Sequence, residues 1–443
     1  MRKEIITFLR NSQYNELKNY LMEMNSADVA QILVELSPEN MLFLFRLLEK
    51  DMAADTFAYM ESEFQEKLIR AMSDAELKDV VSKLYLDDTV ALIGELPANL
   101  VKRILKQTQP SQRALINEFL KYPSDSAGSF MTIEFVDLKA SMTVKEAIDR
   151  IRKVGVNKET IYTCYVLDKC RRLEGIVTVK GLLLAENDTC ISEIMNTNPI
   201  MVTTLEDKEN VAKKFEKYDL LSMPVVDQEN RLVGIITIDD AMDVMQEENT
   251  EDFTKMAAIS PSEDSYFGTS VFKHARNRFV WLLALMLSAT VTGLLITKYE
   301  NAFAVVPLLV SFIPMLMDTG GNCGSQSSTL VIRGLAIEEF YTKDFLRVLW
   351  KEIRVSLLVG VGLAVVNGIR IVIQYNDVSL AVVVGLTLIC TVALSKCLGC
   401  ILPMLAKKMN LDPALMAAPL ITTVVDTCSI IIYFTIATHI MNL

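Results

Sequence analysis

The pattern of hydrophobic residues changes near residue 272. Before it, apolar residues recur at helical spacing between charged residues, as in DVAQILVELSPENMLFLFRLLEK at residues 28–50. After it, apolar runs are much longer, and residues 279–297 form 19 positions without a charge. As a helix this run is about 28 Å long, close to the thickness of a bilayer's hydrocarbon core. The pattern therefore predicts a water-facing front half and a membrane-embedded back half.

Five membrane spans are predicted. After residues 279–297 come residues 302–317, which run into a glycine-rich segment, then 355–375, 380–406 and 413–440. Basic residues gather on the flanks of one side: Lys273, Arg276, Arg278, Arg333, Lys343, Arg347, Lys351, Arg354, Lys407 and Lys408. The first residues carry no unbroken apolar core typical of a secretory signal. We expect a cytosolic N-terminus and Leu443 outside the cell membrane, in agreement with the positive-inside rule.

The front half predicts two different structures. Residues 1–122 read as short amphipathic helices that start near Ser37-Pro38, Ser73-Asp74 and Leu96-Pro97. Residues 130–248 contain an internal repeat, because YVLDKCRRLEGIVTV from Tyr165 aligns with PVVDQENRLVGIITI from Pro224 at an offset of 59 residues. Each copy reads as strand, turn, strand, and we expect the copies to stack on each other.

The distribution of charged residues along the chain limits the classes of partner that the protein can bind. From Lys273 onward there are 13 Lys or Arg and 9 Asp or Glu, a net charge of +4, whereas residues 1–272 carry −15. An acidic front half argues against nucleic acid as a partner, which requires a positive surface. An acidic surface suits the binding of hard cations, although from charge alone a solvated acidic surface is the simpler interpretation. Of the eight cysteines, Cys397 and Cys400 form a CxxC with no second pair, so we interpret them as packing residues rather than zinc ligands.

Two polar features interrupt the predicted spans. Asp426 lies in PLITTVVDTCSIIIYF, with Thr422 and Thr423 one turn earlier, and a carboxylate within a span is expensive unless it has a function or a partner. The alternative is a salt bridge to Lys396. Gly320, Gly321 and Gly324 permit unwound backbone or close helix packing, and the neighbouring Asp318, Asn322 and Gln326 favour a pore lining over a packing interface alone.

The repeat resembles a pair of CBS domains across residues 130–248. In that family a Thr-x-x-Asp often holds the ribose of a nucleotide, and Thr237 with Asp240 has this spacing, whereas Thr178 is followed by Gly181. The resemblance implies at most one adenine-nucleotide site, with ATP as a candidate regulator. The acidic run from Asp239 to Asp252 could form a cation site with Asp87 and Asp88, or simply a solubilising linker helix.

The order of parts resembles the MgtE magnesium channels across essentially the whole chain. The motifs are YPSDSAGSFMT at residues 122–132, GGNCGSQSSTLVIRG at 320–334 and LDPALMAAPLITTVVD at 411–426. The implied fold is multidomain: a helical N domain (1–129), α/β CBS domains (130–248, about 130–190 and 195–248), a connecting helix (249–272) and a five-helix transmembrane domain (273–443). The resemblance also implies a homodimer with a pore on its two-fold axis.

The resemblance assigns two sets of Mg²⁺ ligands. Asp426, Asn322, Thr422 and Thr423 would line the pore. A regulatory sensor would comprise Asp87, Asp88, Asp207, Asp219, Asp240, Asp243, Glu248, Glu251 and Asp252, and high cytosolic Mg²⁺ would close the pore through it. Ile259-Ser260-Pro261-Ser262 interrupts the connecting helix, so this part matches the family less closely.

Two alternatives to Mg²⁺ transport remain. Oxygen ligands favour Mg²⁺ over softer metals, but Mn²⁺ and Co²⁺ would also fit a channel. A membrane-bound CBS nucleotide or metal sensor without transport would leave Asp426 without a role. An enzyme is not expected, because His274 and His439 fall on opposite sides of the membrane and no nucleophile–base pair is recognisable.

Overall fold

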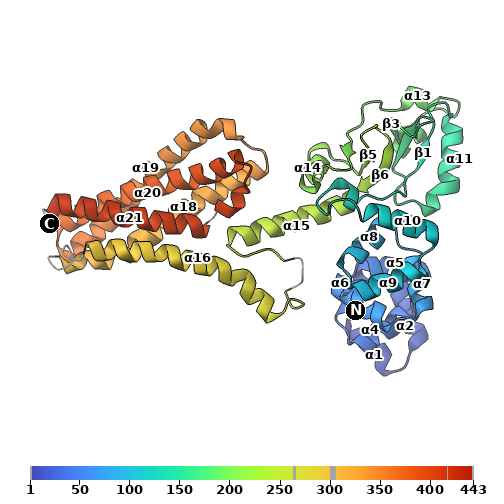
Figure 1. The fold of residues 1–443 in the computed structure, drawn as a ribbon, viewed down its shortest axis with the longest axis horizontal. Coiled ribbons are helices and arrows are strands. Elements are labelled where there is room, and N and C mark those ends of the chain that lie inside the picture. The colour runs from blue at the N-terminus through green and yellow to red at the C-terminus, as the bar shows by residue number, and fades with distance from the viewer. Residues whose placement is uncertain (1, 263–265, 300–305, 417, 442–443) are drawn as a thin grey trace. The chain divides into compact units, whose positions relative to one another are not determined.

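The computed structural model describes residues 2–262, 266–299, 306–416 and 418–441. The chain forms two compact units, Met1–Glu247 and Glu248–Leu443 (Figure 1).

Ten short helices open the first unit, as the amphipathic pattern predicted. Alternate helices pack together, α3 on α5, α5 on α7 and α7 on α9, around buried side chains such as Leu33, Phe57 and Leu77. Ser73 caps α7 in a capping box with Glu76. The bounds are α1 Arg2–Arg10, α2 Tyr14–Met22, α3 Ser26–Val34, α4 Pro38–Phe45, α5 Lys50–Ala58, α6 Ser62–Ala71, α7 Asp74–Val81, α8 Leu86–Glu95, α9 Ala98–Gln107 and α10 Pro110–Phe119.

The internal repeat folds into two matching three-stranded sheets. In each, a short strand pairs in parallel with the second strand, which pairs antiparallel with the third. The strands are β1 Asp137–Leu138, β2 Thr163–Leu167 and β3 Leu173–Thr178, then β4 Val202–Thr203, β5 Ser222–Val226 and β6 Leu232–Thr237. The helices of the copies are α11 Val144–Val154, α12 Val179–Leu184, α13 Ile191–Ile194 and α14 Lys208–Tyr218, with 3₁₀ turns η1 Ala127–Ser129 and η2 Gly155–Asn157.

Gly175 and Gly234 occupy matching positions in the two copies because the backbone of another segment approaches each of them closely. A Cβ at Gly175 would lie 2.7 Å from the carbonyl oxygen of Asn196, and a Cβ at Gly234 would lie 2.7 Å from that of Thr132. The copies also share a core, in which Tyr165 packs with Ile235 and its hydroxyl lies 2.8 Å from Ser222 Oγ. Stacking therefore buries the apolar face that one copy alone would expose.

The connecting helix differs from the prediction. Helix α15 runs from Ile238 to Met256, directly after β6, and the next helix begins only at Val271. Within the predicted range 249–272, α15 therefore covers only residues 249–256, and it begins earlier than predicted. The break coincides with residues 259–262, where proline removes a backbone donor.

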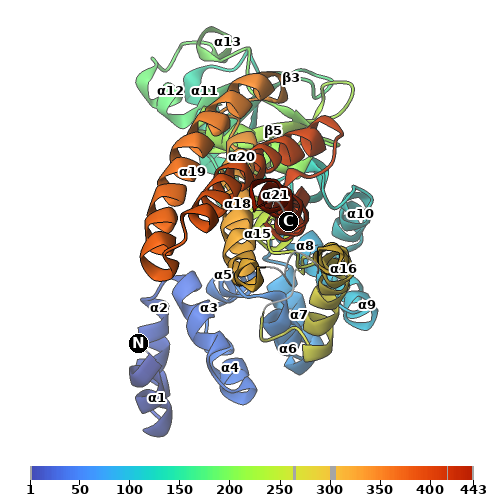
Figure 2. The same ribbon diagram turned by 90° about the vertical axis from the view of Figure 1, so that its left-hand side faces the viewer.

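Five long helices make up most of the second unit: α16 Val271–Lys298, α18 Ile313–Ala336, α19 Phe345–Tyr375, α20 Val378–Lys408 and α21 Ala418–Met441. The 3₁₀ turns are η3 Pro307–Phe312, η4 Thr342–Asp344 and η5 Pro413–Met416. Helix α20 packs against α18, α19 and α21, and both views show α18, α20 and α21 side by side (Figures 1 and 2).

Among the described residues, four helices are long and apolar enough to cross a membrane: those within Val271–Lys298, Thr342–Tyr375, Val378–Lys408 and Pro413–Met441. The remaining long helix, α18, is more polar. The predicted span at 302–317 starts in part outside the described residues, and its later positions form η3 and only the first turn of α18. The helical segment in this region thus lies further along the chain than the hydrophobic run suggested.

Candidate ion sites

A polar stripe runs along α18. Asp318, Asn322 and Gln326 follow at four-residue intervals, so they share one helix face, and all three are exposed in the single chain. The opposite face carries Gly320, Gly324 and Ser327, which are buried against neighbouring helices. Helix α18 therefore presents amide and carboxylate oxygens on a side that no other part of the described chain covers.

The glycines hold α18 close to α21. A Cβ at Gly321 would lie 2.9 Å from Thr422 Cγ2, and a Cβ at Gly324 would lie 2.6 Å from Ile421 Cγ2. The segment is continuous helix, so the unwound backbone considered for these glycines is not observed and the close-packing interpretation holds. Packing and pore lining are not exclusive here, because they occupy opposite faces of α18.

Three predicted pore residues lie on α21 within reach of this stripe. Thr422 and Thr423 both donate their hydroxyl hydrogens to the carbonyl of Pro419, at 2.9 and 3.0 Å, which leaves oxygen lone pairs as acceptors. Asp426 is half-buried one turn later, and the charge of Asp318 is close enough to act on it. Sequence spacing does not show that α18 and α21 meet, so the sequence alone does not identify Asp318 as a neighbour of Asp426.

Lys396 has a different partner from the one considered for Asp426. Its ammonium lies 3.2 Å from Ser327 Oγ and 3.9 Å from Glu352 Oε2, and Ser327 Oγ donates to the same carboxylate at 2.5 Å. These bonds link α18, α19 and α20. Among the described residues no ion pair joins Lys396 to Asp426, so a salt bridge to Lys396 does not explain this half-buried aspartate.

A second group of carboxylates lies within the first unit. Asp87 and Asp88 stand in the first turn of α8, and Asp240 stands in the first turn of α15. Burial, followed by repulsion from Asp240 and Asp88, raises the pKa of Asp87 well above its usual value. Burial and nearby carboxylates also raise the pKa of Asp88 to about 6 and that of Asp240 to about 7. The structure thus brings together three of the predicted sensor residues.

Two further members come from the first CBS copy and were missed in the sequence. Burial, then the charges of Asp240, Asp239, Asp88 and Glu134, raises the pKa of Glu159 to about 8. The Glu159 amide donates to the carbonyl of Glu134 at 2.9 Å, which keeps the two residues together. We call Asp87, Asp88, Glu134, Glu159, Asp239 and Asp240 the acidic cluster.

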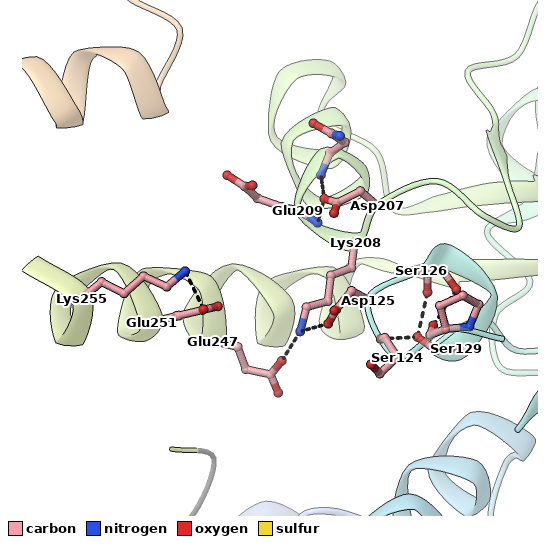
Figure 3. Close-up of polar contacts among 12 residues, drawn as sticks. Ser124, Asp125, Ser126, Ser129, Asp207, Lys208, Glu209, Glu247, Glu251 and Lys255 are labelled. Carbon is pink, nitrogen blue, oxygen red and sulfur yellow. Dashed lines mark hydrogen bonds and ion pairs between the residues drawn. The ribbon is translucent and has the colours of Figure 1, made fainter. Parts of the chain in front are cut away.

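The other predicted sensor residues are placed differently. Asp207 caps α14 through the amides of Glu209 and Asn210, at 3.0 and 3.3 Å (Figure 3). Asp219 ends the same helix with a φ of 50°. Burial and the charges of Glu247 and Asp239 raise the pKa of Asp243, which places it beside the acidic cluster. Glu248, Glu251 and Asp252 follow on α15 but belong to the second unit.

Direct metal coordination by the cluster is not prearranged. In the described parts of the chain, no three His, Cys, Asp or Glu side chains converge closely enough to bind one metal ion. Mg²⁺ dehydrates reluctantly and usually keeps several waters, so more widely spaced carboxylates suit a hydrated ion. The arrangement fits a cation that relieves repulsion rather than a tight structural metal centre.

The positions of the candidate nucleotide motif differ between the two CBS copies. Thr237 Oγ1 donates to Asp240 Oδ2 at 2.6 Å, so this pair is already joined. Thr178 Oγ1 instead accepts from the Gly181 amide at 3.1 Å and caps α12. Only the second copy places a carboxylate beside its threonine.

Comparisons with known families cover most of the chain. Residues 313–436 match the MgtE family described as divalent cation transporters, residues 24–125 match the MgtE intracellular N domain, and residues 127–188 and 191–247 match the CBS domain. A solved structure described as the cytosolic domain of the Mg²⁺ channel MgtE in complex with ATP is 32% identical, with a TM-score of 0.53, over 55% of this chain and 100% of that chain. A second, the soluble part of a magnesium transporter, is 29% identical with a TM-score of 0.53, over 56% of this chain and 97% of that chain.

Three relatives named magnesium transporter MgtE match almost end to end. The Bacillus subtilis protein is 32% identical over 98% of this chain and 96% of its own length. The Thermus thermophilus protein is 33% identical over 97% and 96%, and the Enterococcus faecalis protein is 30% identical over 99% and 96%. The chain therefore belongs to the MgtE family of magnesium transporters.

Proposed function

We propose that this chain forms a Mg²⁺ channel that admits the ion along α18 and α21 and closes when cytosolic Mg²⁺ is high. The observation that carries the proposal is the polar stripe of α18 beside Asp426, in a unit otherwise made of apolar helices. Mg²⁺ prefers oxygen ligands and retains waters, and Asn322, Thr422, Thr423 and Asp426 supply such oxygens. Mn²⁺ and Co²⁺ are the competing ions.

A second copy of the chain would complete the path. In a single chain the polar stripe of α18 is exposed. If it faced lipid, each of its polar groups would carry a free-energy penalty of roughly several kcal/mol. A homodimer with the stripes on its two-fold axis would remove that penalty and place two copies of Asp426 around one pore. Selectivity would then come from cavity size as well as from charge.

The topology follows from counting α18 as a crossing. Its 24 residues reach about 36 Å as a helix, enough to span a bilayer, and its polar stripe explains its lower hydropathy. With α16, α19, α20 and α21 this gives five crossings, a cytosolic N-terminus and an external C-terminus. The basic flanks support the same orientation.

The acidic cluster supports the regulatory half of the proposal. Its carboxylates come from the helical N domain (1–129) and from both copies of the CBS pair (130–248), and burial, together with the charges of neighbouring carboxylates, raises the pKa values of Asp87, Glu159 and Asp240. A hydrated Mg²⁺ would offset that repulsion and favour the docked arrangement. Moving a gate from 1:99 to 99:1 requires roughly 5.5 kcal/mol of differential binding, which several weak sites could supply together.

ATP is proposed as a modulator of this sensor. The support is the solved cytosolic domain described with ATP and the Thr237–Asp240 pair in the second copy. No enzymatic step is proposed. A CBS sensor without transport is the second candidate.

Mg²⁺ uptake into proteoliposomes with low internal Mg²⁺ tests the central proposal. The native chain should take up Mg²⁺, and Asp426→Ala should abolish uptake because the pore loses its carboxylate. Asp377→Asn is a matched control, since this aspartate caps α20 through the Leu380 amide and asparagine retains an acceptor oxygen. Equal uptake by native protein and Asp426→Ala would remove Asp426 from the pore, and binding without uptake would favour the sensor candidate.

A further inference from the structure

Two lysines, Lys208 and Lys255, hold helix α15 through ion pairs at two different places along its length. It is one continuous helix of 19 residues whose first turns belong to the first unit and whose last turns belong to the second. In the first unit, Lys208 Nζ lies 3.4 Å from Glu247 Oε2 on α15 and 3.8 Å from Asp125 Oδ1 (Figure 3). This contact fixes the middle of α15 to the CBS pair.

The second anchor is Lys255, in the last turn of α15. Its ammonium lies 2.6 Å from Glu251 Oε1 on the same helix, the pair drawn in Figure 3, and 2.7 Å from Asp412 Oδ2. Asp412 lies between α20 and α21. The Lys255 and Asp412 side chains are only 23% and 29% exposed, so solvent screens this contact less than it screens a fully exposed pair.

Asp412 belongs to the segment that leads into the candidate pore helix. Its other oxygen accepts from the Ala414 amide at 2.8 Å, which shapes the start of η5. At the end of η5, the carbonyl of Met416 accepts from Ser328 Oγ of α18 at 3.1 Å. Asp412 therefore lies where α15, the start of α21 and α18 are joined by polar contacts.

Lys255 acts as a permanent cation. Burial alone would lower the pKa of its ammonium, but the hydrogen bonds to Asp412 and Glu251 outweigh burial and hold the pKa above its usual value. Near neutral pH the bridge between the two carboxylates therefore persists without a bound metal ion.

We propose that Lys255 is a positioning residue that couples α15 to the pore helices through Asp412. A displacement of α15 imposed at the acidic cluster reaches residues 412–416, and through them α21 and α18. This inference rests on the proposed function, because it assigns the contact through which the cytosolic sensor acts on the pore. Breaking the contact leaves permeation intact and weakens its control by Mg²⁺.

The test is a double-mutant cycle in the full-length protein with Lys255→Gln, Asp412→Asn and the double variant. Asparagine at 412 retains the oxygen that accepts from Ala414. Uptake is measured in proteoliposomes preloaded with increasing Mg²⁺. Each single variant should retain uptake at low internal Mg²⁺ and raise the inhibitory midpoint at least about fivefold, or about 1 kcal/mol since tenfold is about 1.4 kcal/mol. The double variant should shift no further than either single variant.

Lys213→Gln is the matched control. It removes a 2.6 Å ion pair with Glu209 within α14, from a side chain of similar exposure, and should leave the midpoint unchanged. Midpoints within about twofold of native for both Lys255→Gln and Asp412→Asn, or fully additive shifts in the double variant, would overturn the coupling. Absence of Mg²⁺-inhibited uptake by the native chain would instead overturn the proposed function together with this role.

Discussion

Repulsion between carboxylates is the main residue-scale feature of the first unit. Elsewhere in this unit, the hydrogen bond from Arg46 and the capping contact with Ser73 lower the pKa of Glu76 to about 2. In the acidic cluster, by contrast, burial and like charges raise the pKa of Glu159 to about 8 and that of Asp240 to about 7. The first arrangement stabilises the fold when ionised, whereas the second stores repulsion that a cation can relieve.

This repulsion predicts a pH dependence in the absence of divalent cations. The carboxyl pKa values of Asp87, Asp88, Glu159 and Asp240 are raised in the folded state, so the folded unit holds protons that an unfolded chain would release. The resulting stability is lost as pH rises toward about 8, with the sign opposite to that of paired carboxylates. In the presence of a chelator, the backbone amides of α8 should lose protection from hydrogen exchange as the pH rises from 5.5 to 8.5, after correction for the intrinsic exchange rate. Added Mg²⁺ should restore this protection.

Glu159→Gln should reduce that loss, because it removes a carboxylate whose pKa is raised to about 8. Glu186→Gln serves as its control, since Glu186 is exposed on the first CBS copy. Protection that rises with pH, or the same pH dependence in both variants, would contradict the electrostatic account.

At the scale of elements, the main feature is close helix packing at glycine positions in the second unit. Gly320, Gly321 and Gly324 on α18 let the backbone approach α20 and α21, and Gly399 on α20 is approached by the carbonyl of Gly324. Membrane helices gain stability from such close contact because lipid provides no hydrophobic driving force between them. The register set by these glycines also fixes where the polar stripe of α18 lies relative to Asp426.

Gly324→Ala should therefore destabilise the second unit. Its new Cβ would lie 2.6 Å from Ile421 Cγ2 and 3.3 Å from the Ser395 carbonyl, so α18 and α21 must separate. Overpacking of this kind typically costs about 1–3 kcal/mol. Thermal unfolding in detergent should show a lower midpoint than native protein, with reduced Mg²⁺ uptake.

Gly362→Ala provides the comparison, because nothing lies within 4 Å of a Cβ placed at that position of α19. It should leave both the unfolding midpoint and uptake unchanged. Equal midpoints for the two alanine variants would show that the glycine contacts do not determine helix packing.

The whole molecule combines a unit that contains the acidic cluster with a unit of long apolar helices, and α15 continues from one into the other. If the acidic cluster controls the pore, changes within the first unit must alter transport without touching any pore residue. Such coupling is a difference in free energy between two states that Mg²⁺ binds unequally.

Asp240→Asn combined with Asp243→Asn should weaken inhibition by cytosolic Mg²⁺, because it removes two carboxylates whose repulsion the ion relieves. The expected result is a smaller ratio of uptake at low to uptake at high internal Mg²⁺, by about threefold or more, equivalent to about 0.7 kcal/mol. Glu186→Gln with Asp188→Asn removes the same charge from exposed positions of the first copy. An unchanged ratio in the first double variant would separate the acidic cluster from gating.

The local pattern of the sequence was sufficient to predict the helical N domain, the CBS pair and the apolar helices. Leucine periodicity, the repeat offset of 59 residues and long uncharged runs are properties of the chain itself, and secondary structure follows them. The same signals predicted a span at residues 302–317, whereas the long helix described in this region, α18, runs from Ile313 to Ala336. They missed it because the polar stripe of α18 hides a long helix from a test based on hydrophobicity.

The sequence by itself determined the family, the repeat and the presence of an aspartate within an apolar helix. Only the tertiary structure decided which charges meet: Glu134 and Glu159 join Asp87, Asp88 and Asp240, Lys396 pairs with Glu352, and Lys255 reaches Asp412 across 157 positions. Periodicity along a chain reports which face of an element is buried, and it carries no information about which distant element covers that face. Electrostatic contacts depend on that second quantity, because charge interactions fall off with distance in space.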